Sequence, residues 1–234
     1  MNSLAHHIKT ELVALSEGND EYATFNVRIV NSKLPVLGVR VPDLRKLARR
    51  LAKDLTADDA AKLLQFEQPN YEYIFLCGLL ITHIKMSDNR AIELTRQWLP
   101  LTDSWAHIDC FIESKPRFRT QMWWDFALEC LESDAEFTVR YGVISLMCNF
   151  LNDQHIDEVF KQLRSVKHDG YYVKMALAWT YATAAAKYFE RTLLELEKSG
   201  IDSWTRAKAY QKMRESRRFN DKQQAIIKAK RSKL

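Results

Sequence analysis

The feature that most restricts how this chain can fold is a turn signal that recurs at an almost constant spacing. Residues that favour turns and helix N-termini stand at five places, separated by 33, 31, 35 and 33 residues: Asn70, Asp103, Asp134, Asp169 and Asp202. An aromatic residue follows each within three positions, and apolar runs of helical length come next, such as YIFLCGLLI and VISLMCNFL. A period in the thirties with two helices per unit is typical of helical repeats that stack and share one core. Chance spacing in an ordinary helical bundle is the alternative.

The rest of the sequence also favours helices over strands. The 234 residues include only six glycines, and segments such as VPDLRKLARRLAKDL place apolar residues three and four positions apart. Strand-like alternation bounded by Asn-Gly or Asp-Gly turns is missing; the segment DGYYVK at 169–174 comes nearest, and a capped helix explains it as well. We therefore predict an all-α solenoid that forms a single domain over residues 1–234.

The charge is unevenly distributed along the chain. The whole sequence carries a formal net charge of +5, whereas the segment from Thr205 to Leu234 holds eleven Lys or Arg residues against Glu215 and Asp221, a net charge of +9. The first 204 residues therefore carry −4. A basic C-terminal helix or tail from about residue 205 predicts an anionic partner at that end; a solvated, charged terminal helix is the alternative.

Other features indicate the cellular setting. No apolar run reaches the roughly 18 residues that a membrane span needs. The N-terminus MNSLAHHIKTELVALSEG lacks a basic segment followed by an apolar one. The cysteines lie far apart in helix-like contexts without a C-x-x-C pair: Cys77, Cys110, Cys130 and Cys148. We expect a cytoplasmic, monomeric protein with reduced core thiols and no membrane partner.

A candidate site begins in the segment LTDSWAHIDCFI, residues 101–112. Trp105 and Asp109 are four positions apart, which places an indole and a carboxylate on one face of a helix. Core packing is the alternative for Trp105, because tryptophan mostly serves packing. Asp109 lies among apolar residues, where an unpaired carboxylate is costly.

Alignment of the repeats extends this candidate site. Asp109 and Arg140 each stand six residues after the Asp that opens their repeat, so stacking should bring both to one concave surface. Lys174 falls within one residue of the equivalent place, and Trp179 follows about a turn later. An ion pair of Asp109 with Arg140 that merely joins two repeats is the alternative, and core packing is the alternative for Trp179.

Other enzyme classes have little support in the sequence. The six histidines are scattered, and the chain contains no H-E-x-x-H, G-x-x-x-x-G-K-[ST], G-x-G-x-x-G or G-x-S-x-G motif. We expect neither a metal nor an organic cofactor. Cys110 lies near His107, but nothing orients such a pair, which favours a buried thiol over a nucleophile.

Four segments resemble the AlkD-type DNA alkylation repair proteins, which are bacterial alkylpurine DNA glycosylases built from HEAT-like helical repeats: LGVRVPDLRKLARRLAK (37–53), DSWAHID (103–109), DAEFTVRYGVISLM (134–147) and DGYYVKMALAWTYATAAAKYFE (169–190). The resemblance covers roughly residues 5 to 220. Its most specific element is the W-x-x-x-D pair followed by an Arg and a Trp. It implies a right-handed superhelical solenoid of antiparallel helix pairs whose concave basic face binds double-stranded, alkylated DNA.

The same resemblance implies roles for individual residues. Trp105 and Trp179 match the two active-site tryptophans, Asp109 matches the active-site carboxylate, and Arg140 and Arg45 match contacts to the DNA backbone. A purine alkylated at N3 or N7 is cationic and leaves without a general acid, so a carboxylate that stabilises the sugar cation and positions water suits the reaction. Indole faces attract such cations by ~0.5–2 kcal/mol each. Basic residues on the same face, including Lys174 beside Arg140, grip phosphates. An open groove without a base-flipping pocket is implied as well.

One segment departs from the family pattern. Active members carry, before GVRVP, a helix whose tyrosine reaches into the minor groove, whereas this chain reads DEYATFNVRIVNSKLPVLGVR with Ile29 at the place of that tyrosine. The β-branched residues, the turn signal Asn31-Ser32 and Pro35 predict that this helix is missing, as in a divergent branch of the family. In such a branch damage recognition is weakened or lost.

Three functions therefore stay open at this stage. The first is an alkylpurine DNA glycosylase, which the Trp/Asp/Arg/Trp set favours. The second is a catalytically weak or inactive DNA-binding paralogue that engages other DNA structures, which the altered N-terminal segment favours. The third is a protein-binding helical scaffold, because solenoids commonly serve that purpose.

Overall fold

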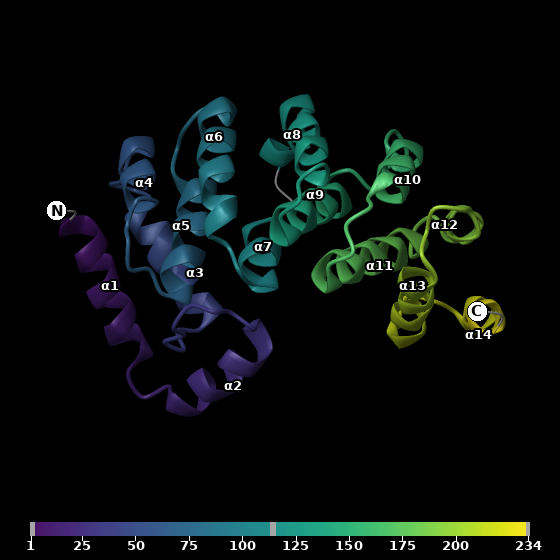
Figure 1. The fold of residues 1–234 in the computed structure, drawn as a ribbon, viewed down its shortest axis with the longest axis horizontal. Helices are drawn as coiled ribbons and strands as arrows, with labels where there is room; N and C mark the ends of the chain where they lie inside the picture. The colour runs from purple at the N-terminus through teal and green to yellow at the C-terminus, as the bar shows by residue number, and fades with distance from the viewer. Residues whose placement is uncertain (1–2, 113–115, 233–234) are drawn as a thin grey trace. The chain divides into compact units, whose positions relative to one another are not determined.

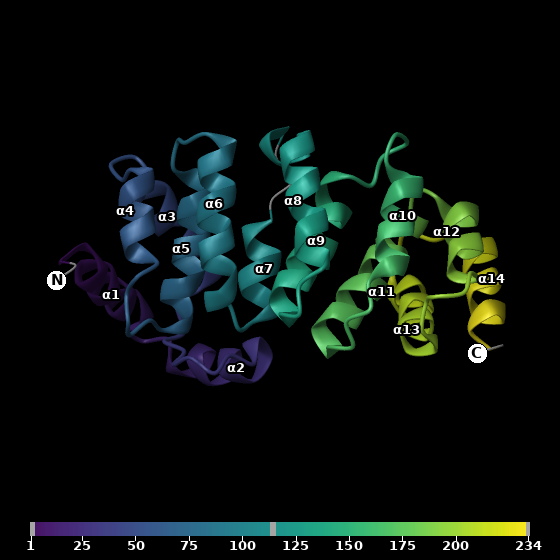
Figure 2. The same ribbon diagram turned by 45° about the horizontal axis from the view of Figure 1, so that its top comes forward.

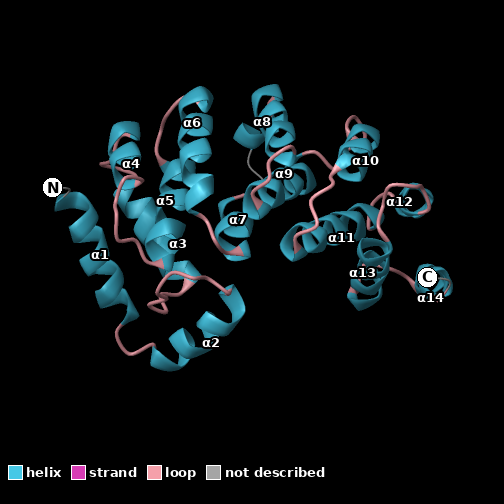
Figure 3. Ribbon diagram, in the orientation of Figure 1, coloured by secondary structure: helices cyan, strands magenta, loops and turns pink. Residues whose placement is uncertain are grey.

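The computed structural model describes residues 3–112 and 116–232, and all regular structure in these ranges is helical (Figures 1 and 3). This confirms the all-α prediction and fits a helical repeat fold. The chain divides into two compact units, Met1–Glu113 and Ser114–Leu234. The single domain, the right-handed superhelix and the concave basic face stay predictions. Within the described ranges, no helix is both long and apolar enough to cross a membrane.

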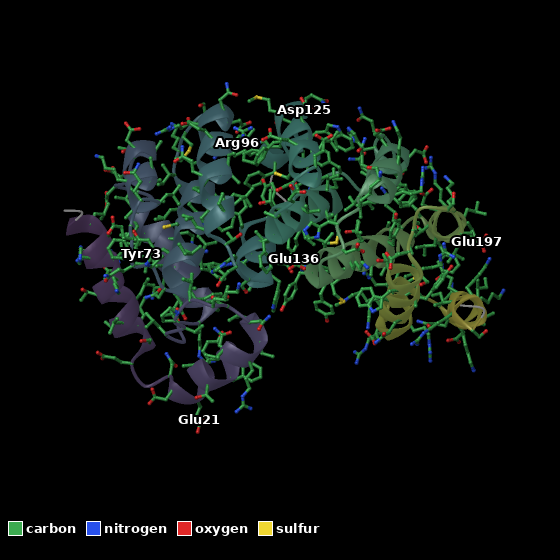
Figure 4. All side chains as sticks on the ribbon, viewed as in Figure 1. Glu21, Tyr73, Arg96, Asp125, Glu136 and Glu197 are labelled. Carbon is green, nitrogen blue, oxygen red and sulfur yellow. The ribbon has the colours of Figure 1, made fainter. Side chains whose placement is uncertain are left out.

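The first unit is built around one helix, α5, that is buried over all but its last residue. Its elements are α1 (Ser3–Ser16), α2 (Asp20–Val30), α3 (Val41–Leu51), α4 (Ala57–Leu63), α5 (Tyr71–His83), α6 (Asp88–Trp98), the 3-10 helix η1 (Leu99–Leu101) and α7 (Trp105–Phe111). α1, α3, α4, α6 and α7 all contact α5, and Figure 2 shows α4 and α6 beside it. Apolar residues around the whole circumference of α5 are what such a central position requires. Tyr73, labelled in Figure 4, is buried there and donates its hydroxyl to the carbonyl of Leu63 at 3.0 Å.

α5 and α6 meet at a glycine. A Cβ on Gly78 would lie 2.5 Å from the indole of Trp98, so only a glycine lets the ring pack against the α5 backbone. Trp98 is fully buried, and its indole N–H donates to the carbonyl of Ile74 at 2.8 Å. This contact fixes how closely the two helices approach.

The N-terminal segment corrects one expectation. A helix, α2, does form over Asp20–Val30, and it ends at Asn31, whose backbone is left-handed with φ 49°. The acidic Asp20 and Glu21 occupy the first turn, where they stabilise the positive end of the helix dipole. β-branched residues cost a helix only about 0.5 kcal/mol each, too little to prevent it from forming. The predicted turn at Asn31-Ser32 is confirmed, but the prediction that this helix is missing is wrong.

The loop between α2 and α3 is ordered by a buried acid. Glu72 of α5 accepts the backbone N–H groups of Leu37, Gly38 and Val39 at 3.0, 2.8 and 3.3 Å. Burial raises the pKa of the Glu72 carboxyl, whereas these hydrogen bonds oppose that rise because they favour the charged form. Gly38 has a φ of +91°, and a Cβ there would lie 2.6 Å from the Cβ of Ala23, so α2 packs directly on this loop.

The second unit stacks its helices in series. Its elements are the 3-10 helix η2 (Pro116–Arg119), α8 (Gln121–Leu131), α9 (Glu136–Asn149), α10 (Ile156–Ser165), α11 (Tyr171–Ala185), α12 (Phe189–Leu196), α13 (Ser203–Glu215) and α14 (Asp221–Arg231). α9 packs against α8 and α11, α11 packs against α12 and α13, and α13 packs against α14. Figures 1 and 2 show α11 running beside α13. Serial contact of this kind is typical of helical repeats.

The predicted period is confirmed as a property of the helices. α5, α7, α9, α11 and α13 begin at residues 71, 105, 136, 171 and 203, which are 34, 31, 35 and 32 residues apart. Asn70 caps α5 by accepting the Tyr73 N–H at 2.8 Å, and Asp202 caps α13 by accepting the Thr205 N–H at 3.0 Å. In the other three helices the N-cap is one residue later than the predicted Asp: Ser104, Ala135 and Gly170.

The four cysteines are free thiols, but the prediction of buried core thiols holds only for two of them and is wrong for Cys110 and Cys148, which lie at helix faces that reach solvent. Cys77 and Cys130 are buried, and Cys110 and Cys148 are partly exposed. Burial raises the pKa of the Cys77 thiol well above its ordinary range, which keeps it protonated and unreactive.

Candidate nucleic-acid interface

In the first unit, α7 presents Trp105 and Asp109 on one face. Both side chains and that of Cys110 are partly exposed, whereas the remaining α7 residues are buried: Ala106, His107, Ile108 and Phe111. The prediction that the indole and the carboxylate share a face one turn apart is confirmed for this helix.

The start of α7 is tied to the end of α2. The indole N–H of Trp105 donates to the carbonyl of Ile29 at 2.9 Å, and the buried hydroxyl of Ser104 donates to the carbonyl of Val30 at 2.6 Å. The last carbonyls of a helix have no partner within the helix. Ser104 and Trp105 therefore satisfy two of these groups in α2 and fix the edge of the Trp105 ring.

Asp103 holds the turn that follows α2. Its carboxylate accepts the Ser32 hydroxyl at 2.8 Å and the backbone N–H groups of Lys33 and Leu34 at 2.6 and 3.3 Å. The three consecutive residues Asp103, Ser104 and Trp105 thus form one clamp on residues 29–34. We call this set the DSW clamp.

His107 is a core residue of this unit. Its ring is stacked on Tyr71 at 4.6 Å, and its Nε2 lies 3.0 Å from the Tyr71 carbonyl, so Nε2 carries the proton of the neutral ring. Burial lowers the pKa of His107 to about 4, although the Tyr71 hydrogen bond and the charge of Asp103 oppose this shift. A neutral, enclosed imidazole is not placed to activate Cys110.

In the second unit, Arg140 supports the first turn of α11. Its side chain is only 5% exposed, and Nη1 donates to the carbonyl of Tyr172 at 2.7 Å. Glu136, labelled at the start of α9 in Figure 4, accepts the backbone N–H of Tyr172 at 2.6 Å. One arginine and one glutamate of α9 therefore grip both backbone groups of Tyr172.

The other predicted residues are more accessible. Trp179 on α11 is 37% exposed, and Lys174, one to two turns earlier, is partly exposed and forms an ion pair with Asp169 at 2.9 Å. The hydrogen bond to Asp169 raises the pKa of Lys174, so its ammonium group is charged at neutral pH. Arg45 on α3 in the first unit is half-buried, and among the described residues its Nε has no hydrogen-bond partner.

Comparison with protein families identifies the chain. A family model described as DNA alkylation repair enzyme matches residues 8–213, most of the sequence. The chain belongs to this DNA alkylation repair family. Comparison with curated proteins and with solved structures gave no match. Membership implies interaction with DNA, and it confirms the resemblance that the four sequence segments carry.

For this DNA alkylation repair family member, each unit contributes part of the predicted site. The first unit brings Trp105 and Asp109 together, and the second places Arg140 and Lys174 in the N-terminal halves of α9 and α11. The predicted neighbourhood of Asp109 and Arg140 joins two units and stays a prediction. Among residues 3–112 and 116–232, no cluster of His, Cys, Asp and Glu could hold a metal ion.

Sequence reasoning missed the residues that support this family site. The repeat pattern marks Asp103 only as a turn residue and gives Ser104 no role, although both bind a segment about 70 residues earlier. Glu72 was overlooked because a single acid in an apolar run shows no periodic pattern. An acid at such a position is a usable signal, since a buried carboxylate must be satisfied by donors.

Proposed function

We propose that this protein is a DNA glycosylase that hydrolyses the N-glycosidic bond of cationic N3- or N7-alkylated purines in duplex DNA. One observation carries the proposal: within a DNA alkylation repair family member, Trp105 and Asp109 share the partly exposed face of α7. An indole and a carboxylate one turn apart are both within reach of a ligand on this face.

The proposed chemistry follows from the two side chains. The lesion base is a good leaving group because it already carries positive charge, so the enzyme supplies electrostatic stabilisation of the sugar cation and a positioned water. Asp109 would provide both. The face of Trp105 would receive the cationic base. The DSW clamp supports this role by fixing the edge of the partly exposed Trp105 ring.

Phosphate contacts are proposed for Arg45, Lys174 and Arg140. Arg45 and Lys174 are partly exposed cations, and phosphate would compete with Asp169 for Lys174. Arg140 differs, because a 5% exposed guanidinium that supports Tyr172 offers DNA only a small edge. The logarithm of DNA affinity falls linearly with the logarithm of salt concentration. We expect Arg45→Gln and Lys174→Gln each to make this slope less steep by about 0.9.

Release of 7-methylguanine and 3-methyladenine from methylated duplex DNA tests the proposal. Asp109→Asn keeps the shape of the side chain and removes its charge, so release should fall at least about 100-fold. Asp125→Asn on the exposed surface of α8, labelled in Figure 4, is the matched control because it changes net charge equally. Equal release by the wild type and Asp109→Asn would rule out catalysis by this carboxylate.

One observation favours a second candidate, a catalytically weak DNA-binding paralogue. α2 exposes Phe25, Val27 and Ile29, of which Phe25 and Ile29 share a face, and the tyrosine of this helix, Tyr22, lies under the guanidinium of Arg40 at 4.8 Å. Salt-dependent duplex binding without base release would select this candidate. Duplex binding that does not respond to salt would instead point to a protein-binding scaffold.

A further inference from the structure

The first turns of α9, α11 and α13 carry a connected set of aromatic rings in the second unit. The ring of Phe137 lies 5.4 Å from that of Tyr172, Tyr172 lies 5.2 Å from Tyr171, and Tyr171 lies 5.9 Å from Trp204. These are centroid distances at which rings interact. We call these four rings the aromatic ladder.

The outer end of the ladder is open to solvent. Tyr171 is 58% exposed and Trp204 is 38% exposed, although rings of this size are usually packed away. Core formation does not require them, because α11 and α13 already pack through buried residues such as Val173, Ala176 and Ala209.

The ladder continues along α11 toward Trp179. Tyr172, Met175 and Trp179 are spaced three and four residues apart, so they lie on one helical face, and all three are at least partly exposed. From Tyr171 to Trp179 the helix rises about 12 Å, roughly three to four steps of stacked bases at ~3.4 Å each. An exposed apolar path therefore leads from Trp204 to Trp179.

The charge around the ladder suits a polyanion. The ammonium group of Lys208 lies 5.5 Å from the Trp204 ring centroid, and α13 and α14 belong to the strongly basic C-terminal segment. Of the nearby acids, Asp169 is paired with Lys174, Asp202 caps α13, and Glu136 accepts the Tyr172 N–H. Rings interleaved with cations are the arrangement that binds single strands, since bases stack and phosphates meet positive charge.

We propose that the aromatic ladder is a stacking platform for unpaired DNA bases. The inference rests on the proposed function insofar as the partner is DNA. A fully paired duplex covers the faces of its bases by stacking them on each other, so it cannot use the exposed rings in this way. The protein should therefore prefer DNA in which a few bases next to the bound site are unpaired.

Fluorescence anisotropy with two oligonucleotides tests the platform: a fully paired duplex and the same duplex interrupted by a single-stranded gap of about six nucleotides. The wild type should bind the gapped DNA more tightly. The double variant Tyr171→Ala/Trp204→Ala should lose roughly 30-fold of the gapped-DNA affinity, the effect of about one stacked base per ring, and keep its duplex affinity. Equal affinity of the wild type for both oligonucleotides would overturn the proposal.

Two further variants separate stacking from folding. Tyr171→Phe/Trp204→Phe keeps two rings and should retain most of the preference; a loss as large as that of the alanine pair would contradict stacking. Tyr188→Ala removes a ring elsewhere in the unit, where the Tyr188 hydroxyl donates to Asp153 at 2.7 Å, and should leave the preference intact. If Tyr188→Ala abolished it equally, general destabilisation would be the cause and the ladder would be excluded.

The outcome is distinguishable from failure of the proposed function. Base release from fully paired methylated DNA depends on Asp109 and does not involve the ladder. An active glycosylase without preference for gapped DNA would refute only the platform, and gap preference without base release would refute only the glycosylase.

Discussion

The indole nitrogen of Trp105 donates a hydrogen bond to the carbonyl of Ile29 at 2.9 Å. This bond joins the proposed active-site helix to the end of α2, the segment in which the sequence departs from the family pattern. The altered segment therefore helps to hold the proposed active-site helix in place.

Trp105→Phe should separate the contribution of the aromatic face of this residue from that of its hydrogen bond to Ile29. The substitution keeps an aromatic face and removes the bond to Ile29, so we expect about 1 kcal/mol lower stability and less base release from a ring that is no longer fixed. Urea denaturation and the release assay measure both. Trp179→Phe provides the comparison, because it shortens a 37% exposed ring on α11. Unchanged release by Trp105→Phe would show that the fixed edge is unimportant.

The DSW clamp predicts an asymmetry between two aspartates at equivalent repeat positions. Asp103→Asn brings an amide N–H₂ against the donors of Ser32, Lys33 and Leu34. This should lower the free energy of unfolding by about 1–3 kcal/mol. Asp134→Asn changes an exposed aspartate of the next repeat and should stay within about 0.5 kcal/mol. Amide hydrogen exchange should accelerate at residues 33 and 34 only in Asp103→Asn. Similar losses in both variants would argue against the clamp.

Stability should decline on mild acidification because of His107. Its pKa is about 4 in the folded protein against 6.5 for an unperturbed histidine, so between these values the unfolded chain binds more protons. The contribution is fully present above pH 6.5, is lost as the pH falls toward 4, and amounts to about 3 kcal/mol. Urea midpoints across this range should drop less steeply in His107→Gln than in the wild type. Parallel curves would indicate that other groups dominate.

Gly78→Ala should be far more harmful than an alanine at an open glycine. The new methyl group would lie 2.5 Å from the buried Trp98 ring and force α5 and α6 apart, at a cost of about 2–3 kcal/mol. Gly18→Ala meets nothing within 4 Å, so only its φ of +74° opposes the change, by about 1 kcal/mol. Thermal unfolding of both variants measures the difference. A milder effect at Gly78 would mean that Trp98 can move.

Local periodicity made much of this architecture predictable. The five helices α5, α7, α9, α11 and α13 begin within two residues of the recurrent turn signals, because polar caps and apolar runs act over one or two turns of chain. The shared face of Trp105 and Asp109 follows from the same spacing rule. The end of α2 at Asn31 was predictable for the same reason, because the Asn31-Ser32 turn signal is also local.

Only the tertiary structure decided how these pieces are supported. The sequence by itself determined the helices, their period, the free thiols and the family. It did not reveal that α2 forms despite its β-branched residues, or that Asp103 and Ser104 bind residues 30–34. It also left Arg140 looking like a surface cation, although burial against Tyr172 encloses it. The physical reason is range: helix propensity and capping depend on neighbours in the chain, whereas burial and donor–acceptor pairing depend on which distant segments packing brings into contact.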